Sequence, residues 1–203
     1  MNADATIYVL AGVNGSGKSS IGGAAFTSRG VVFYNPDTVA RRLCELHPNL
    51  TKNLANSHAW RLGREILEEP IARRKTYAFE TTLGGRTITE LLVQASRNGL
   101  KVKLWYVGLD SVERNISRVR ARVARGGHPI PEADIRRRWN TSRRNLIDLL
   151  PSLSALRLHD NSPEANPHAG EPPLPRLLLH LGNGKIVGPD DLSRSAAWAK
   201  TIL

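Results

Sequence analysis

Short apolar runs alternate with amphipathic stretches along the first 160 residues of the chain. Five of the apolar runs are brief and end at glycine, proline or polar residues, which predicts strands at 7–10, 30–35, 75–79, 101–107 and 156–159. Between them, apolar residues recur every three or four positions, which predicts a helix that starts at 21–26, helices at 53–69 and 86–98, and helices beginning near 37, 111 and 132. Alternating strands and helices predict an α/β fold, a five-stranded parallel sheet with helices on both faces.

The remaining forty or so residues show a different pattern. Residues 162–175 are rich in proline, alanine and asparagine and predict a linker or loop. Residues 176–181 and 185–187 flank Gly182-Asn183-Gly184, which predicts a hairpin, and 189–203 predicts a helix that docks on the core. We therefore expect one domain at 1–162, with a helical lid at 111–150, and a linker with a C-terminal extension packed on that domain at 163–203.

The composition is that of a globular protein, with 40% hydrophobic and 23% charged residues among 203. No apolar run approaches the roughly 18 residues needed to cross a bilayer, and the first residues carry no signal-type segment. The single cysteine, Cys44, excludes an internal disulfide. We expect a cytoplasmic protein without a membrane partner.

The chain has an excess of positive charge, +11 from 29 basic against 18 acidic residues. Such an excess indicates either a polyanionic partner such as nucleic acid or arginines that bind the phosphates of small ligands. Residues 113–148 hold ten arginines against four acids, on two predicted helices joined at Gly126-Gly127. This concentration favours a lid whose arginines close over phosphates, and it leaves a nucleic-acid partner open.

Residues 12–19, G-V-N-G-S-G-K-S, match the phosphate-binding loop G-x-x-x-x-G-K-[ST], with a predicted strand before and a predicted helix after. Backbone N–H groups of such a loop surround the phosphates of a nucleotide. Lys18 is expected to reach the β- and γ-phosphates of ATP, and the Ser19 hydroxyl is expected to bind Mg²⁺. The predicted nucleotide-binding residues are Gly12, Asn14, Gly15, Ser16, Gly17, Lys18, Ser19 and Ser20.

Polar residues follow the second and third predicted strands directly. Asp37 follows the second, where it could cap the next helix or act in catalysis, and its position alone favours neither role. Glu80 and Thr82 follow the third, where an acid and a hydroxyl suit ligand contacts better than packing. Glu80 and Asp160 are the nearest candidates for a second Mg²⁺ contact.

These residues together predict a P-loop phosphotransferase. Lys18 would bind the donor phosphates, Asp37 could accept the proton of an attacking hydroxyl, and lid arginines would stabilise developing charge. A polynucleotide or small-metabolite kinase is an alternative. A nucleotide-dependent binding or switch protein is another, and it would not need Asp37.

The ordered motifs resemble the zeta-toxin family of P-loop kinases over roughly residues 6–162. They are A-G-V-N-G-S-G-K-S-S, N-P-D-T, F-E-T-T-L-G-G, R-V-R-A-R-V-A-R-G-G-H-P-I-P with I-R-R-R-W-N-T-S-R-R-N-L, and D-N-S. The last motif also fits the compact, free-standing branch often described as predicted ABC-type ATPases.

The resemblance implies ATP-dependent phosphorylation of a sugar hydroxyl, in the best-known members the 3′-hydroxyl of UDP-N-acetylglucosamine. It implies that Asp37 is the general base and that Glu80 and Thr82 hold the acceptor. It further implies that Arg125 and Arg138 stabilise the transferring phosphoryl group, and that a small antitoxin protein is a partner.

One position departs from the family pattern, and a second has two expected roles. Thr81 stands where many members carry glycine beside the acid, which could reshape the acceptor pocket. His128, in the predicted hinge, is expected either to touch the substrate or only to cap a helix.

Overall fold

The computed structural model describes residues 5–18, 33–127, 129–163, 175–193 and 195–203. The predicted helix at 21–26 and the predicted site residues Ser19, Ser20 and His128 lie outside the described residues.

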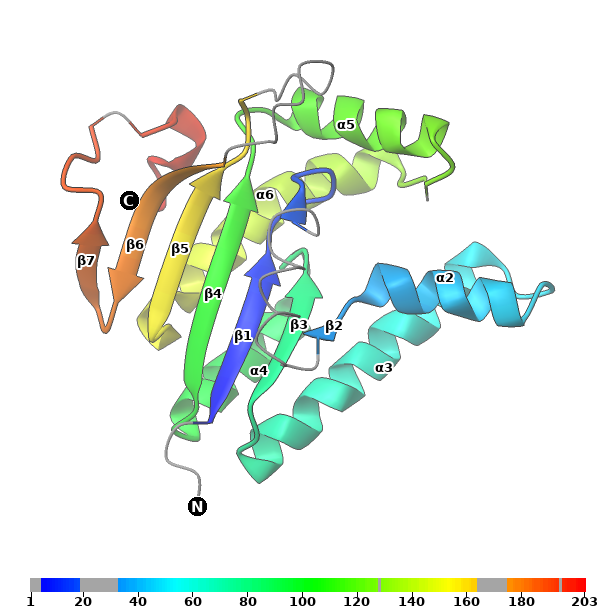
Figure 1. Ribbon diagram of the computed structural model, residues 1–203, viewed down its shortest axis with the longest axis horizontal. Coiled ribbons are helices and arrows are strands. Elements are labelled where there is room, and N and C mark those ends of the chain that lie inside the picture. Colours follow the sequence, from blue (N-terminus) through cyan, green and yellow to red (C-terminus); the bar gives the residue numbers. More distant parts are fainter. Residues whose placement is uncertain (1–4, 19–32, 128, 164–174, 194) are drawn as a thin grey trace.

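A seven-stranded sheet forms the centre of the molecule, in the order β2-β3-β1-β4-β5-β6-β7 (Figure 1). The first five strands in the chain pair in parallel, as predicted. The predicted hairpin continues the sheet beyond β5 in antiparallel pairing, so the sheet has seven strands rather than five. The strands are β1 (Thr6–Ala11), β2 (Phe33–Tyr34), β3 (Tyr77–Thr81), β4 (Lys101–Gly108), β5 (Ala155–Asp160), β6 (Arg176–Gly182) and β7 (Lys185–Gly188).

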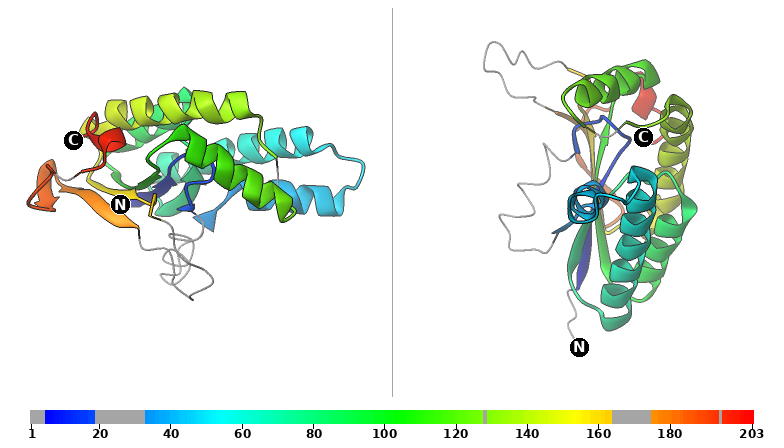
Figure 2. Two further views of the ribbon diagram at one scale, coloured as in Figure 1. Left: turned by 90° about the horizontal axis from the view of Figure 1, so that it is seen from above. Right: turned by 90° about the vertical axis from the view of Figure 1, so that its right-hand side faces the viewer.

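Five α-helices follow the strands in the described ranges, and α3, α4 and α6 cover the same face of the sheet (Figure 2). α5 lies near the edge where the parallel strands end (Figure 1). The helices are α2 (Pro36–Leu46), α3 (Lys52–Arg73), α4 (Arg86–Arg97), α5 (Val112–Ala124) and α6 (Glu132–Leu149).

Two helix predictions were wrong. α3 does not stop at Pro70 but continues to Arg73, because a proline removes only the single helical hydrogen bond of its own N–H and Pro70 is itself buried. The predicted C-terminal helix is a single 3-10 turn, Ala197–Ala199, in the described part of 189–203. Before it, the Asp191 carboxylate accepts from the Ser193 N–H at 2.8 Å, and such local bonds compete with helix formation.

The core lies between the sheet and its helices. β1 and β4 contribute fully buried residues such as Val9 and Val102, and Leu92 of α4 and Leu146 of α6 close over them. Trp198 belongs to the same core, so the C-terminal segment packs on the sheet. None of the helices in the described ranges is both long and apolar enough to cross a membrane.

Candidate functional site

The phosphate loop follows β1, between the carboxyl ends of β3 and β4. Ligands of open α/β sheets bind at this edge. Gly12 has φ +137°, and a Cβ there would lie 2.1 Å from the Val107 carbonyl oxygen, so no larger residue fits. Gly15 and Gly17 also have positive φ, +77° and +86°. The sequence thus forms a tight loop against the end of β4.

Three side chains from distant segments hold this loop. Asn115 of α5 donates to the Asn14 carbonyl at 2.7 Å, and Arg138 of α6 donates to the Asn14 side-chain oxygen at 2.9 Å. Asn161, after β5, donates to the Ser16 carbonyl at 2.8 Å. The loop is therefore positioned by both helices of the predicted lid and by the D-N-S motif.

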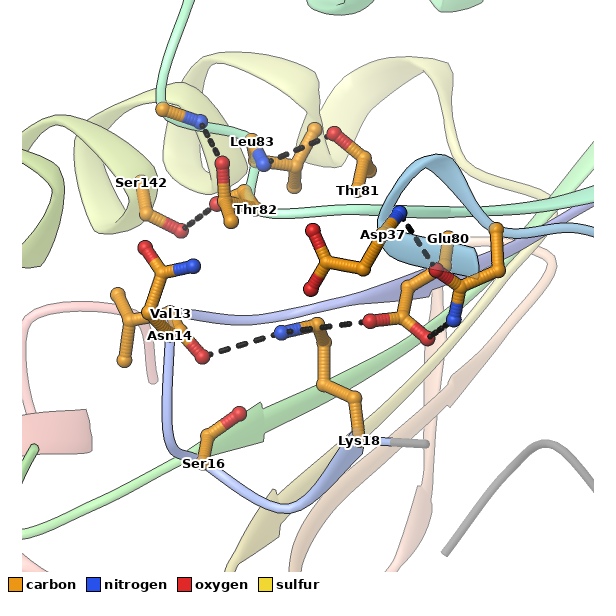
Figure 3. Close-up of polar contacts among 12 residues, drawn as sticks. Val13, Asn14, Ser16, Lys18, Asp37, Glu80, Thr81, Thr82, Leu83 and Ser142 are labelled. Atoms are coloured by element: carbon orange, nitrogen blue, oxygen red, sulfur yellow. Dashed lines mark hydrogen bonds and ion pairs between the residues drawn. The ribbon is translucent and has the colours of Figure 1, made fainter. Parts of the chain in front are cut away.

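Lys18 is 6% exposed and lies beside an acid. Its ammonium group donates to the Val13 carbonyl at 3.1 Å and lies 3.8 Å from the Glu80 carboxylate (Figure 3). Glu80, at the end of β3, is itself buried. The structure therefore brings together two predicted residues that are far apart in the sequence.

The surroundings of Lys18 disfavour the charged form of its side chain. Burial lowers the pKa of Lys18, and the nearby guanidinium groups of Arg122 and Arg138 add to this effect, while Glu80 and Asp37 oppose it. Even with Glu80 and Asp37 nearby, a buried lysine whose charged form is disfavoured by burial gains from the binding of an anion. The polyphosphate of a nucleotide would supply that negative charge.

Asp37 does not cap the helix that follows the second strand. Asn35 does so: its side-chain oxygen accepts from the N–H groups of Asp37 at 2.9 Å and Thr38 at 3.2 Å. The Asn35 amide also donates to Glu80 at 2.9 Å. The carboxylate of Asp37 points toward the space in front of Lys18 (Figure 3). Of the two roles that the sequence left open, the capping role is excluded.

A cavity of about 540 Å³ is lined by six of the predicted residues. Its size is typical of a small-molecule site. The predicted residues that line it are Asn14, Lys18, Asp37, Glu80, Thr82 and Arg138. A second wall comes from α3 and the start of α4, with Asn53, Asn56, Ser57, Trp60, Arg64, Gly85, Thr87 and Ile88.

Arg125 does not belong to this group. It is exposed at the end of α5, where its guanidinium donates to the Ala121 carbonyl at 3.3 Å, and it does not line the cavity. The resemblance placed Arg125 and Arg138 together because they flank one hinge in the sequence. In the structure only Arg138 reaches the phosphate loop.

Asp160 and Glu80, the two candidates for the second Mg²⁺ contact, differ in their surroundings. Asp160 is buried and accepts from the Ser162 N–H and hydroxyl and, at 3.3 Å, from the Trp198 indole. It also lies 3.8 Å from Arg176. Asp160 therefore holds the C-terminal segment, and Glu80 is the acid next to Lys18.

Several residues at the site were missed by the sequence reasoning. Asn35 could have been found, since asparagine before a proline at the first turn is a typical helix start. Asn115 and Arg122 lie in an arginine-rich helix whose pattern does not distinguish them from solvated residues. Trp60 gave no signal, because a single aromatic residue in an amphipathic helix normally belongs to the core.

Comparison with known proteins gives the family and the fold. The AAA domain model matches residues 7–144. An uncharacterized protein of Haemophilus influenzae is 33% identical over 129 residues, 63% of this chain and 88% of that protein. The likeness extends beyond the phosphate loop to most of the sheet and its helices.

Among solved structures, AvrRxo1-ORF1:AvrRxo1-ORF2 with sulphate ions matches with TM-score 0.71 and 16% identity, over 98% of this chain and 64% of that chain. The same complex with ATP matches with TM-score 0.68 and 16% identity, over 98% and 63%. The chain thus spans a little less than two thirds of those chains. The PezAT toxin-antitoxin system of Streptococcus pneumoniae matches with TM-score 0.55 and 13% identity, over 79% and 69%. The predicted P-loop kinase fold is confirmed.

Proposed function

Because the chain belongs to the AAA domain family, we propose that it is an ATP-dependent kinase that transfers the γ-phosphoryl group to a hydroxyl of a sugar or nucleotide sugar. One observation carries the proposal: the phosphate-loop lysine, a carboxylate and an arginine face a single cavity. In phosphoryl transfer the donor phosphate, the attacking hydroxyl and the groups that stabilise charge must meet in one place.

ATP is the proposed donor. The loop and Lys18 would bind its phosphates, and a structure of AvrRxo1-ORF1:-ORF2 with ATP, which shares the fold, supports this choice. Arg138 contacts the loop through Asn14 and would stabilise the negative charge that develops on the transferred group.

Mg²⁺ fits the residues present. Glu80 offers carboxylate oxygens, the ligand type that Mg²⁺ prefers, next to the phosphate loop. Ser19, outside the described residues, is the other proposed ligand. The ion would neutralise charge on the β- and γ-phosphates.

Asp37 is the proposed general base. Its carboxylate lines the cavity and, since Asn35 caps α2, it is not committed to the helix end. It would take the proton of the acceptor hydroxyl as that oxygen attacks the γ-phosphorus and ADP leaves. Glu80 and Thr82 line the same cavity and would hold the acceptor.

The resemblance to zeta toxins supports UDP-N-acetylglucosamine as an acceptor to try first. It also supports an antitoxin-like protein as a partner, as do two structures of similar fold, a toxin-antitoxin system and a two-protein complex.

The proposal is tested by mass spectrometry of a panel of sugars and nucleotide sugars incubated with the protein, ATP and Mg²⁺. We expect one phosphorylated product that Lys18→Ala abolishes. Asp37→Asn should retain ATP affinity but lose about 10²-fold or more in kcat, the size of a lost general base. Asp148→Asn, an exposed change on α6 outside the cavity, is the matched control and should retain full activity.

Two results would contradict the proposal. Full turnover in Asp37→Asn would exclude that residue as the base. ATP binding without any phosphorylated panel member would remove the sugar acceptor, and oligonucleotide 5′ ends would be tried next. If these also fail, a nucleotide-dependent switch becomes the better description.

A further inference from the structure

The wall of the cavity that α3 forms differs in its side chains from the end at the phosphate loop. Four residues of α3, Asn53, Asn56, Ser57 and Trp60, line the cavity at spacings of three and four, so they form one helix face. Trp60 is 49% exposed, a large fraction for an indole that lines a hollow. Leu54 is equally exposed on the same helix but does not line the cavity.

The neighbouring face of α3 fixes the helix in place. Ala55 and Ala59 are fully buried, and a Cβ on Gly63 would lie 2.6 Å from the Tyr34 ring. The Tyr34 hydroxyl donates to the Ala59 carbonyl. Ala55 and Ala59 thus pack α3 against α2 around Ala40, and Gly63 lets α3 approach Tyr34 of β2 closely. Trp60 is therefore presented to the cavity by a helix held firmly beside the start of α2.

The two ends of the cavity differ in charge. The phosphate end carries four ionic groups, those of Lys18, Arg138, Asp37 and Glu80, and the α3 face carries amides, a hydroxyl, an indole and the guanidinium of Arg64, which is paired with Glu68 at 3.2 Å. Ionic groups suit the reacting phosphate and hydroxyl. An indole beside amides suits a flat ligand ring that bears hydrogen-bonding groups. The ligand ring can stack on the face of the indole while polar side chains hydrogen-bond the groups at the edge of the ligand ring.

We propose that this face of α3 is the ring-binding subsite of the acceptor, with a sugar or nucleobase ring lying on the Trp60 indole. The proposal rests on the proposed function, because it places the rest of the acceptor in the cavity that holds Asp37. Asn53 and Ser57 hydrogen-bond the edge of the ring, and the binding of the ring directs the reacting hydroxyl toward Asp37. The acceptor class is thereby narrowed to ring compounds that extend from the reacting hydroxyl toward α3.

The test measures ligand binding without ATP, so that no transfer is required. The probes are UDP-N-acetylglucosamine, uridine, adenosine and N-acetylglucosamine, titrated calorimetrically and by tryptophan fluorescence. We expect Trp60→Ala to weaken binding of a ring probe by about tenfold to a hundredfold and Trp60→Phe to retain most of the affinity. Leu54→Ala, equally exposed on the same helix but outside the cavity, should bind as the wild type does.

The set of probes distinguishes a nucleobase ring from a sugar ring on Trp60. A loss confined to the nucleosides and the nucleotide sugar assigns a nucleobase to Trp60, and a loss that extends to N-acetylglucosamine assigns the sugar. Thermal unfolding of Trp60→Phe confirms that the fold is kept.

Failure of this inference is distinguishable from failure of the kinase. If a product forms but Trp60→Ala leaves both the acceptor KM and the affinity unchanged, the subsite is wrong and the kinase stands. If ring probes bind through Trp60 but none is phosphorylated, the subsite stands and the kinase is wrong. If no probe binds the wild-type protein, the subsite is wrong.

Discussion

At the scale of single residues, Asn35 connects two acids that the sequence keeps far apart. Its side-chain oxygen caps α2 and so sets the first turn, where Asp37 lies. Its amide nitrogen donates to Glu80 at 2.9 Å. Because both ends of one amide are engaged, the orientation of the group is fixed. Asn35 therefore positions the proposed base relative to the acid beside Lys18.

Substitutions at Asn35 separate its two contacts. Asn35→Ala removes the cap and should cost about 1 kcal/mol of unfolding free energy. Asn35→Asp retains the cap but places a carboxylate against Glu80, so we expect it also to destabilise the protein. Glu80→Gln should restore stability in the Asn35→Asp background, since a donor then faces the introduced carboxylate. Denaturant unfolding of the wild type, Asn35→Asp, Glu80→Gln and the double variant measures the coupling energy, and strictly additive effects would show that the contact between residues 35 and 80 does not contribute to stability.

His159 of β5 makes stability depend on pH. Burial lowers the pKa of His159 below the ordinary 6.5, and the Arg157 guanidinium contributes to the shift. The unfolded chain binds this proton more tightly than the folded one, so unfolding takes up a proton below pH 6.5. This part of the stability is present above pH 6.5 and declines as the pH falls toward the lowered pKa.

The expected consequence is a smaller acid dependence of Tm in His159→Gln than in the wild type between pH 7.5 and pH 5. The exposed His47→Gln is the matched control and should keep the wild-type slope. A slope in His159→Gln identical to that of the wild type would assign the acid sensitivity to other groups.

At the scale of elements, α5 and α6 are joined by ion pairs, and each helix donates a hydrogen bond to the phosphate loop. Arg136 of α6 lies 3.1 Å from Glu113 of α5, and Arg120 of α5 lies 2.9 Å from Glu132 of α6. Many of the arginines thus have acidic partners on the helices themselves. The charge concentration that predicted a phosphate-binding lid therefore serves helix pairing as well, and few of its arginines face the cavity.

The hydrogen bond from α5 to the phosphate loop should contribute more to stability than the ion pairs between α5 and α6. Asn115 is fully buried, and Asn115→Ala leaves the Asn14 carbonyl without this donor. We expect a loss of about 1–3 kcal/mol and weaker nucleotide binding. Arg120→Ala removes only an exposed ion pair and should cost less than about 1 kcal/mol. Equal effects of the two changes, measured by denaturant unfolding and ATP titration, would contradict this difference.

The sequence predicted elements better than it predicted their contacts. The five parallel strands were found because buried parallel strands are short, continuous apolar runs. The positions of Lys18, Asp37 and Glu80 at one edge followed from the parallel topology alone. The contribution of Trp60 and the separation of Arg125 from the site could not be predicted, because helix periodicity does not reveal which side of a helix meets a cavity.

At the scale of the whole molecule, the C-terminal segment supports the phosphate loop indirectly. Trp198 packs so closely on β4 that a Cβ at Gly108 would lie 2.1 Å from the indole. Its N–H donates to Asp160, whose neighbour Asn161 donates to Ser16 in the loop. A chain of contacts thus runs from the C-terminal segment to the nucleotide site.

Trp198→Ala should therefore affect both stability and binding. We expect a loss of about 3–5 kcal/mol on removal of a buried tryptophan, together with a lower ATP affinity at temperatures where the protein stays folded. Leu203→Ala, at a more exposed apolar position of the same segment, should change neither quantity appreciably. An unchanged ATP affinity in folded Trp198→Ala would show that the segment stabilises the core without influencing the loop.

The packing of Trp198 against Gly108 also has a consequence for biosynthesis. Translation produces the phosphate loop and all five parallel strands before Trp198. Until then the end of β4 lacks the indole that covers it, and Asp160 lacks one of its donors. A nascent chain should thus acquire nucleotide affinity late, which limits ATP capture by incompletely synthesised copies.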